Sequence, residues 1–291
     1  MAGIRTIKFK ARALVILSKL ISQFNRRVEG ITTAYNLRYE RGFGRAHKLD
    51  IMQREGLKGA PCVLYMHGGG WSAFDKDVFR STCKRLSNCG TLVFNCNHRL
   101  APKFGILHML EDAYAAFRYV VANAEKYGGD AGRIILAGDS SGAHILSMFL
   151  NRAIRDGDDN IVSRVAGCAF FYGVYDLETV RDTGFKNIGP YMNAFISPDT
   201  ENYEELLREY SPIHLVNGKH PPAFISCGET DVLTASQSLK YIKALEENGV
   251  RVHSLIFPKE CADAAHRFIT YDDNPASVEA FKQFKNFLEQ L

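Results

Sequence analysis

From about residue 60 onward, short apolar runs alternate with longer amphipathic stretches. The short runs are rich in β-branched and aromatic residues and are bounded by turn residues, which is typical of buried strands. We therefore predict strands over six segments: 61–67, 91–97, 133–138, 165–171, 222–228 and 252–257. The longer stretches predict helices near 77–88, 107–127, 142–155, 234–248 and 276–290. This order predicts an α/β fold with a doubly wound, mainly parallel sheet and helices on both faces.

Two segments depart from this alternation. "YNLRYE" (35–40) and "HKLDIM" (47–52) predict an antiparallel hairpin at the edge of the sheet. Residues 176–214 separate two predicted strands by more than a simple crossover requires, and long insertions of this kind are often lids. The insertion contains large apolar side chains, which argues against a purely solvated loop: Phe185, Tyr191, Met192 and Phe195. We expect one domain over residues 1–291.

The N-terminal stretch "IRTIKFKARALVILSKLISQF" (4–24) mixes basic and apolar residues. Its apolar positions recur every three or four residues, which predicts an amphipathic helix. Lys19 interrupts the apolar run, and no A-x-A cleavage site follows. The run is shorter than the roughly 20 apolar residues that a spanning helix needs. We expect this helix to pack on its own domain, with a basic helix lying on a membrane surface as the alternative.

Composition limits the classes of partner. Hydrophobic residues make up 46% of the chain and charged residues 23%, enough to fill a large core. The net charge of +4 is too small to indicate a nucleic-acid partner. The seven cysteines include no CxxC pair, which predicts a reduced, cytoplasmic protein without disulfides or structural zinc. A homodimer is an open alternative to a monomer.

The sequence "GDSSG" (138–142) contains the pattern G-x-S-x-G between a predicted strand and a predicted helix. That context defines a nucleophile elbow, in which a strained turn exposes the central serine. Ser140 is therefore the predicted nucleophile. Ser141 has a different predicted role, because its backbone N–H at the start of the helix can face a developing oxyanion. We expect no role for the Ser141 side chain.

A second glycine-rich turn, "MHGGGW" (66–71), follows an earlier predicted strand. Backbone without Cβ atoms can turn its N–H groups into a cavity, and we predict Gly68 and Gly69 as oxyanion donors. We expect the remaining residues of the two turns to belong to the motif or to line the substrate pocket: His67, Gly70, Trp71 and Asp139. The His67 side chain is expected to hydrogen-bond to the backbone.

A serine nucleophile needs a base to take its proton and an acid to orient that base. In this fold these partners follow the serine in the order Asp or Glu, then His. Asp231 follows the strand over 222–228 and is the predicted acid, with Glu229 as its rival. His266 follows the last predicted strand and is the predicted base. Asp263 lies near this histidine but on a loop, where a turn role is expected.

No pattern in the sequence predicts a metal or a nucleotide cofactor. There is no HExxH, and the histidines and acidic residues do not cluster at ligand spacing. No G-x-G-x-x-G follows the first predicted strand.

Five motifs together resemble the hormone-sensitive lipase-like branch of the α/β-hydrolases. They span roughly residues 60 to 270 in the order "HGGGW" (67–71), "HRLAP" (98–102), "GDSSG" (138–142), "DVL" (231–233) and "HRF" (266–268). The resemblance implies a carboxylic ester hydrolase without a cofactor and the same roles for the residues assigned above. It also implies a cap built from about residues 1–45 and 176–212.

The sequence departs from this family at four positions. Members commonly carry tyrosine where His98 stands, alanine at Ser141, proline at Val232 and glycine at Arg267. None of these changes removes a catalytic group. Arg267 stands beside the predicted base and can alter the charge or size of the pocket, which leaves substrate preference open.

The functional hypothesis is a serine carboxylesterase or deacetylase that acts on a small-molecule ester through an acyl-enzyme. The aromatic insertion predicts an enclosed pocket and hence short-chain, acetyl-like acyl groups. An amidase or arylformamidase using the same triad is the alternative enzyme. A non-catalytic small-molecule receptor is the alternative from another class, although plant hormone receptors that resemble this family have lost the catalytic histidine, which is present here as His266.

Overall fold

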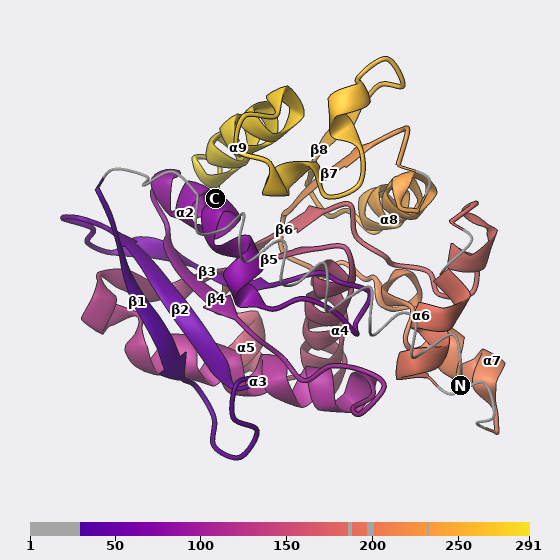
Figure 1. The fold of residues 1–291 in the computed structure, drawn as a ribbon, viewed down its shortest axis with the longest axis horizontal. Helices are drawn as coiled ribbons and strands as arrows, with labels where there is room; N and C mark the ends of the chain where they lie inside the picture. The colour runs from indigo at the N-terminus through magenta and orange to yellow at the C-terminus, as the bar shows by residue number, and fades with distance from the viewer. Residues whose placement is uncertain (1–29, 186–187, 197–200, 232) are drawn as a thin grey trace.

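A computed structural model describes residues 30–185, 188–196, 201–231 and 233–291. Its centre is an eight-stranded sheet with the order β1-β2-β4-β3-β5-β6-β7-β8 (Figure 1). The strands are β1 (Ile31–Arg38), β2 (Lys48–Arg54), β3 (Ala60–Met66), β4 (Leu92–Cys96), β5 (Gly129–Asp139), β6 (Val165–Phe171), β7 (Ala223–Gly228) and β8 (Val252–Phe257). The α-helices are α2 (Arg80–Asn88), α3 (Ile106–Asn123), α4 (Ser141–Asp156), α5 (Asp159–Val162), α6 (Ile188–Phe195), α7 (Tyr203–Glu209), α8 (Ala235–Glu247) and α9 (Pro275–Leu288).

The strand directions confirm the predicted α/β fold. β1 pairs antiparallel with β2, and β2 pairs antiparallel with β4. Every other neighbouring pair in the sheet, from β4 to β8, is parallel. The antiparallel hairpin predicted at one edge is therefore present, with β1 beginning four residues earlier than the predicted segment, at Ile31.

Alternation along the strands divides the core into two layers. Along β3, Leu64 and Met66 point into a layer that includes apolar side chains of α3, α4 and α8. Val63 and Tyr65 point the other way, into a layer that includes α2 and α9. Both faces of the sheet are thus covered by helices, as expected for strands that are buried on both sides (Figure 1).

The fold brings the loops with candidate chemistry to one edge of the sheet. β3 ends at Met66 before the glycine turn, and β5 ends at Asp139 before Ser140. β7 and β8 end upstream of Asp231 and His266. Since parallel strands have their carboxyl ends on the same side, all four loops meet there, where ligands bind in open α/β sheets.

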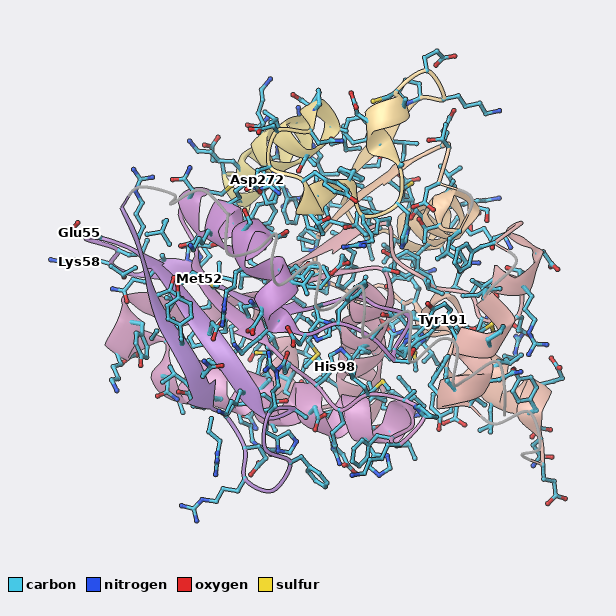
Figure 2. The ribbon with its side chains drawn as sticks, in the orientation of Figure 1. Met52, Glu55, Lys58, His98, Tyr191 and Asp272 are labelled. Atoms are coloured by element: carbon cyan, nitrogen blue, oxygen red, sulfur yellow. The ribbon has the colours of Figure 1, made fainter. Side chains whose placement is uncertain are left out.

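The long insertion contains ordered elements that periodicity did not predict. They are the 3-10 helices η3 (Val180–Asp182) and η4 (Pro212–Leu215), together with α6 and α7. Met192 and Phe195 of α6 are buried in the core. Figure 2 shows Tyr191 on the inner side of this region, whereas Glu55 and Lys58 lie at the opposite end of the molecule and point outward.

The prediction that residues 1–45 contribute to a cap needs correction in its described part. Residues Ile31–Arg38 form strand β1 and so belong to the central sheet. The amphipathic helix predicted over 4–24 lies outside the described residues. None of the helices in the described part of the chain is both long enough and apolar enough to cross a membrane.

Candidate active site

Ser140 lies in a strained turn between β5 and α4. Its backbone angles are φ 48° and ψ −118°, a conformation that side-chain-bearing residues rarely adopt. The N–H of Ser140 donates to the carbonyl oxygen of Phe171 at 3.0 Å, which ties the turn to the end of β6. A Cβ atom on Gly142 would lie 2.1 Å from the carbonyl oxygen of Met66. The second glycine of the motif is therefore required by the close approach of α4 to β3.

His266 and Asp231 are hydrogen-bonded to each other. Their Nδ1 and Oδ2 atoms lie 2.7 Å apart, and the Asp231 side chain is 1% exposed against 30% for His266. Thr234 donates its hydroxyl to the same carboxylate oxygen at 2.6 Å. The backbone N–H groups of Leu233 and Thr234 donate to the other oxygen at 3.0 and 3.2 Å. The carboxylate is thus fixed on both oxygens and holds the imidazole with its Nε2 directed away from Asp231.

The surroundings of Asp231 keep its carboxylate ionised. Burial acts to raise its pKa, but the hydrogen bond and charge of His266 and the donors of Thr234 and Leu233 outweigh this effect. The net result is a pKa below the usual value for aspartate. An ionised carboxylate next to Nδ1 favours the imidazole tautomer with its proton on Nδ1, so that Nε2 can accept a proton.

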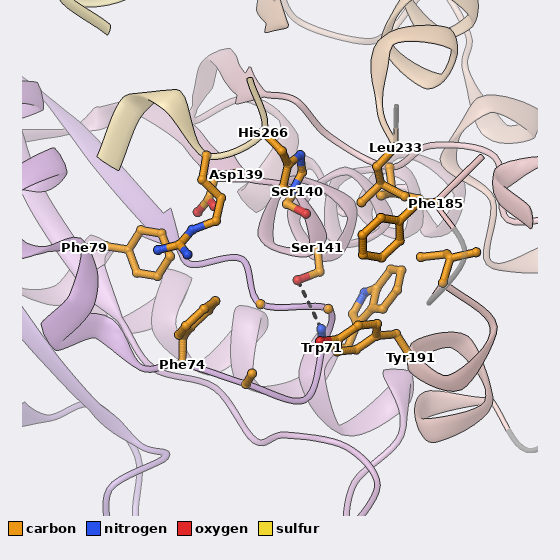
Figure 3. Close-up of a pocket in the computed structure, with 16 residues that line it drawn as sticks. Trp71, Phe74, Phe79, Asp139, Ser140, Ser141, Phe185, Tyr191, Leu233 and His266 are labelled. Atoms are coloured by element: carbon orange, nitrogen blue, oxygen red, sulfur yellow. Dashed lines mark hydrogen bonds between the residues drawn. The ribbon is translucent and has the colours of Figure 1, made fainter. Parts of the chain in front are cut away.

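Ser140 and His266 line one cavity of about 190 Å³ (Figure 3). Figure 3 shows them near its centre, with Phe74 and Phe79 on one side and Trp71, Phe185, Tyr191 and Leu233 on the other. Gly69, Gly70, Ser141 and Asp139 also line this cavity. Phe185, Ile188 and Tyr191 come from the insertion, so the insertion forms one wall of the site.

The prediction that Gly68 donates to the oxyanion needs correction. Its N–H donates to the Oδ1 of Asp139 at 2.8 Å and is therefore engaged within the protein. Asp139 also accepts the hydroxyl of Tyr65 at 2.7 Å and is 1% exposed. Burial raises the pKa of Asp139, and the hydrogen bonds from Tyr65 and Gly68 partly offset that effect. Gly69 and Gly70 are the glycines of this turn that line the cavity.

The Ser141 side chain has a contact that the sequence did not predict. Its Oγ accepts the backbone N–H of Trp71 at 3.2 Å (Figure 3). The Nε1–H of Trp71 then donates to Nδ1 of His144 at 3.1 Å, and Nε2 of His144 lies 2.8 Å from the carbonyl oxygen of Tyr210. The Trp71 ring also stacks on Phe195 with centroids 4.2 Å apart. The glycine turn is therefore tied to both α4 and the insertion.

His67 lies outside the cavity lining, under the glycine turn. Its Nδ1 lies 2.8 Å from the carbonyl oxygen of Gly68, which is the backbone contact expected for it, and its ring stacks on His98 at 4.5 Å. Burial and the neighbouring His98 lower the pKa of His67 to about 3. His67 is thus a neutral structural residue and cannot serve as a base at ordinary pH.

Sequence reasoning missed several residues that position the site. Thr234 follows Asp231 by three positions, a spacing typical of a side chain that caps a local turn, and this signal was available. Tyr65 and Tyr172 carried no such signal. The Tyr172 ring lies against the His266 imidazole with centroids 4.9 Å apart, and its backbone φ is 38°.

One other cluster of ligand-type side chains occurs in the described part of the chain. Asp176, Glu178 and His214 have potential ligand atoms within 4.8 Å of one another. His214 and Glu178 pair at 2.5 Å, and Asp176 pairs with Lys240 at 3.3 Å. These contacts account for the cluster, which does not line the cavity of Ser140.

This fold and this arrangement of residues define an α/β-hydrolase. Residues 63–269 match the model of a family described as having the alpha/beta hydrolase fold. The chain belongs to that family, which confirms the resemblance identified from its motifs.

Individual relatives agree with the family. The chain is 30% identical over 229 residues to a probable isoprenylcysteine alpha-carbonyl methylesterase from Oryza sativa subsp. japonica, covering 72% of this chain and 53% of that protein. It is 29% identical over 236 residues to esterase LipQ from Mycobacterium tuberculosis, covering 77% and 55%. The chain thus spans little more than half the length of these curated relatives. The crystal structure of esterase B from Lactobacillus rhamnosis aligns with a TM-score of 0.84 and 21% identity, covering 100% of this chain and 96% of that one.

Proposed function

We propose that this protein is a serine carboxylesterase that hydrolyses short-chain acyl esters through an acyl-enzyme. One arrangement carries the proposal: Ser140 at a strained turn shares a cavity with His266, whose Nδ1 lies 2.7 Å from Asp231. A nucleophile, a base and an orienting acid in this order are the requirements of acyl transfer through a serine. The names of the two curated relatives described above, a methylesterase and an esterase, support ester chemistry.

In the proposed mechanism, the Oγ of Ser140 attacks the ester carbonyl carbon while Nε2 of His266 accepts the hydroxyl proton. Asp231 holds the imidazole in the required tautomer and stabilises the imidazolium that forms. Collapse of the tetrahedral intermediate breaks the bond to the alcohol oxygen, and His266 returns the proton to the leaving alcohol. A water molecule then attacks the acyl-enzyme by the same steps and releases the acid.

The negative oxygen of the intermediate needs donors that are free in the resting protein. We assign this role to the N–H groups of Gly69, Gly70 and Ser141. Gly69 and Gly70 line the cavity, and Ser141 is the first residue of α4, where a helix leaves its N–H groups unpaired. Gly68 is left out, because its N–H is taken by Asp139. Each such donor contributes about 3–4 kcal/mol to lowering the barrier.

The size of the cavity supports a small acyl group. At about 190 Å³ it lies below the roughly 300–1,000 Å³ of sites for drug-sized ligands. Its lining is largely aromatic and aliphatic, which suits a short apolar chain better than a sugar or a peptide.

The test is hydrolysis of 4-nitrophenyl esters from acetate to octanoate by the full chain and by the Ser140→Ala variant. We expect highest kcat/KM at acetate to butyrate and a loss of at least about 10⁴-fold in the variant. A 4-nitrophenyl phosphonate should add one phosphonyl group to the wild type and none to Ser140→Ala, as read by intact-protein mass. Faster cleavage of acetanilide than of phenyl acetate would favour an amidase, and binding of esters without turnover would favour a receptor.

A further inference from the structure

Arg267 brings a positive charge into a cavity whose lining is otherwise largely apolar. It follows His266 directly and lines the same cavity. Its backbone is left-handed, with φ 73°, a conformation that turns the chain sharply after the base. Its guanidinium lies over the Phe74 ring, 4.8 Å from the centroid.

Phe74 places this charge close to the reacting centre. The ring of Phe74 lies against the glycine turn, since a Cβ atom on Gly69 would come within 2.9 Å of its Cδ2. Arg267 therefore stacks on a ring that itself packs on the turn assigned to the oxyanion. Figure 3 shows Phe74 and Phe79 on one side of Ser140, opposite the lobe formed by Phe185, Tyr191 and Leu233.

Among the described residues, no carboxylate lies within ion-pair distance of Arg267. Its Nε is buried and has no hydrogen-bond partner in that part of the chain. Asp139 lines the same cavity, but its carboxylate accepts hydrogen bonds from Tyr65 and Gly68 and forms no ion pair with Arg267. The charge of the guanidinium therefore has no carboxylate of the described residues at ion-pair distance, and an anionic group in the cavity would interact with it favourably.

We propose that Arg267 forms a subsite for a carboxylate group carried by the ester substrate. The apolar lobe beside the insertion takes one part of the ester, and the lobe of Phe74, Phe79 and Arg267 takes the part with the charge. A single guanidinium in a cavity that also holds the buried Asp139 carboxylate suits a monoanion better than a phosphate dianion. This inference rests on the proposed esterase function, because it names the class of ester that the same site prefers.

Two matched pairs of esters test the subsite. Mono-4-nitrophenyl succinate differs from 4-nitrophenyl butyrate in that a carboxylate replaces the terminal methyl group of the acyl chain. 3-Carboxyphenyl butyrate differs from phenyl butyrate in that it carries a carboxylate on the alcohol part of the ester. The readout is the ratio of kcat/KM for the charged ester to that for its neutral partner, after subtraction of spontaneous hydrolysis.

We expect Arg267→Gln to lower this ratio at least tenfold in one pair, and Arg267→Lys to keep a larger share of it. Arg133→Gln removes a positive charge from an exposed position near the start of β5 and serves as the control with an unchanged ratio. Equal losses on the charged and neutral esters of both pairs in Arg267→Gln would leave both ratios unchanged. That result would mean that Arg267 only balances Asp139, and it would overturn the proposal.

A binding measurement separates this inference from the proposed function. Calorimetry with the Ser140→Ala protein should show 3-carboxyphenyl butyrate or mono-4-nitrophenyl succinate bound at least tenfold more tightly than its neutral partner. Ser140→Ala combined with Arg267→Gln should lose that difference. Selective binding without turnover by the wild type would overturn the esterase function and support the subsite. Turnover of neutral esters without selective binding would support the function and overturn the subsite.

Discussion

The backbone N–H of Gly68 and the Oδ1 of Asp139 lie 2.8 Å apart, so the residue before the nucleophile holds the glycine turn in place. Removing the carboxylate leaves two buried donors unpaired, the Gly68 N–H and the Tyr65 hydroxyl. Each unpaired donor costs about 1–3 kcal/mol. We expect Asp139→Ala to lower kcat about 100-fold on 4-nitrophenyl butyrate, with a smaller change in KM.

Tyr65→Phe is the matched control for this change, because it removes one of the two contacts and leaves the glycine turn bonded to Asp139. Its kcat should stay within about fivefold of wild type, the effect of one hydrogen bond. Equal losses in the two variants would show that Asp139 does not act through the turn.

Ser141→Ala separates the side chain of this residue from its backbone. The variant keeps the N–H assigned to the oxyanion and loses the Oγ that accepts the Trp71 N–H at 3.2 Å. One such hydrogen bond is worth about 1 kcal/mol, so we expect kcat to fall about fivefold. Steady-state kinetics beside Ser140→Ala provides the comparison, and losses of the same size in both variants would contradict the assignment of Ser140 as nucleophile.

Asp231→Asn tests the orienting acid. The amide keeps the size of the side chain but presents an N–H or a neutral oxygen to Nδ1 of His266, which no longer favours the productive tautomer. We expect kcat to fall about 10⁴-fold at neutral pH, the scale of this change in other triads. Glu229→Gln is the control, since Glu229 is exposed and, among the described residues, the hydrogen bond and ion pair of His266 are with Asp231 and not with Glu229. A larger loss in Glu229→Gln would reverse the assignment of the acid.

Acid should destabilise the protein through its buried histidines. Burial lowers the pKa of His67 to about 3, with a contribution from His98, and that of His144 to about 4. Because an unfolded histidine titrates near 6.5, the unfolded chain binds more protons below that pH, and stability falls as the pH decreases. Each histidine contributes about 1.4 kcal/mol per pH unit between roughly pH 6 and its folded pKa.

Urea unfolding followed by far-ultraviolet circular dichroism from pH 7 to 5 measures this slope. In His144→Gln one titrating group is gone, so the slope averaged between pH 7 and 5 should be less steep by about 1 kcal/mol per pH unit, whatever the stability of the variant at pH 7. An unchanged slope would show that His144 does not remain neutral in the folded protein.

Phe185→Ala tests whether the insertion limits the acyl chain. Phe185 lines the cavity beside the nucleophile, and its removal opens space for further methylene groups, each worth about 0.8 kcal/mol when buried. We expect the ratio of kcat/KM for octanoate to that for butyrate to rise at least tenfold. Tyr271→Ala removes an exposed aromatic ring outside the cavity lining and should leave that ratio unchanged. A rise of the same size in both variants would place the limit elsewhere.

Much of the site could be predicted because strand ends determine where side chains meet. Ser140, Asp231 and His266 each follow a strand of the parallel part of the sheet, and parallel strands bring such positions to one edge. The glycine turn was harder to interpret, because three consecutive glycines are indistinguishable in the sequence. Which amide faces the cavity depends on the Asp139 carboxylate, which arrives from a strand far along the chain.

The insertion shows a different limit of sequence patterns. Its helices are short, at 8 residues for α6 and 7 for α7, so each offers too few turns for a clear apolar period. Their order comes from tertiary contacts such as the stacking of Phe195 on Trp71, which local propensity does not contain. The family resemblance implied a cap that includes strand β1, whereas the residue pattern predicted the hairpin at the sheet edge that the structure shows.

The position of Trp71 gives the protein an intrinsic optical probe of its own active site. The sequence contains one tryptophan, and this residue is 1% exposed at the junction of the glycine turn, α4 and the insertion. All of the indole fluorescence therefore originates beside the oxyanion turn. Ligand binding, displacement of Phe195 or rearrangement of the turn should each shift the emission of an unlabelled sample, so that these events can be followed in real time.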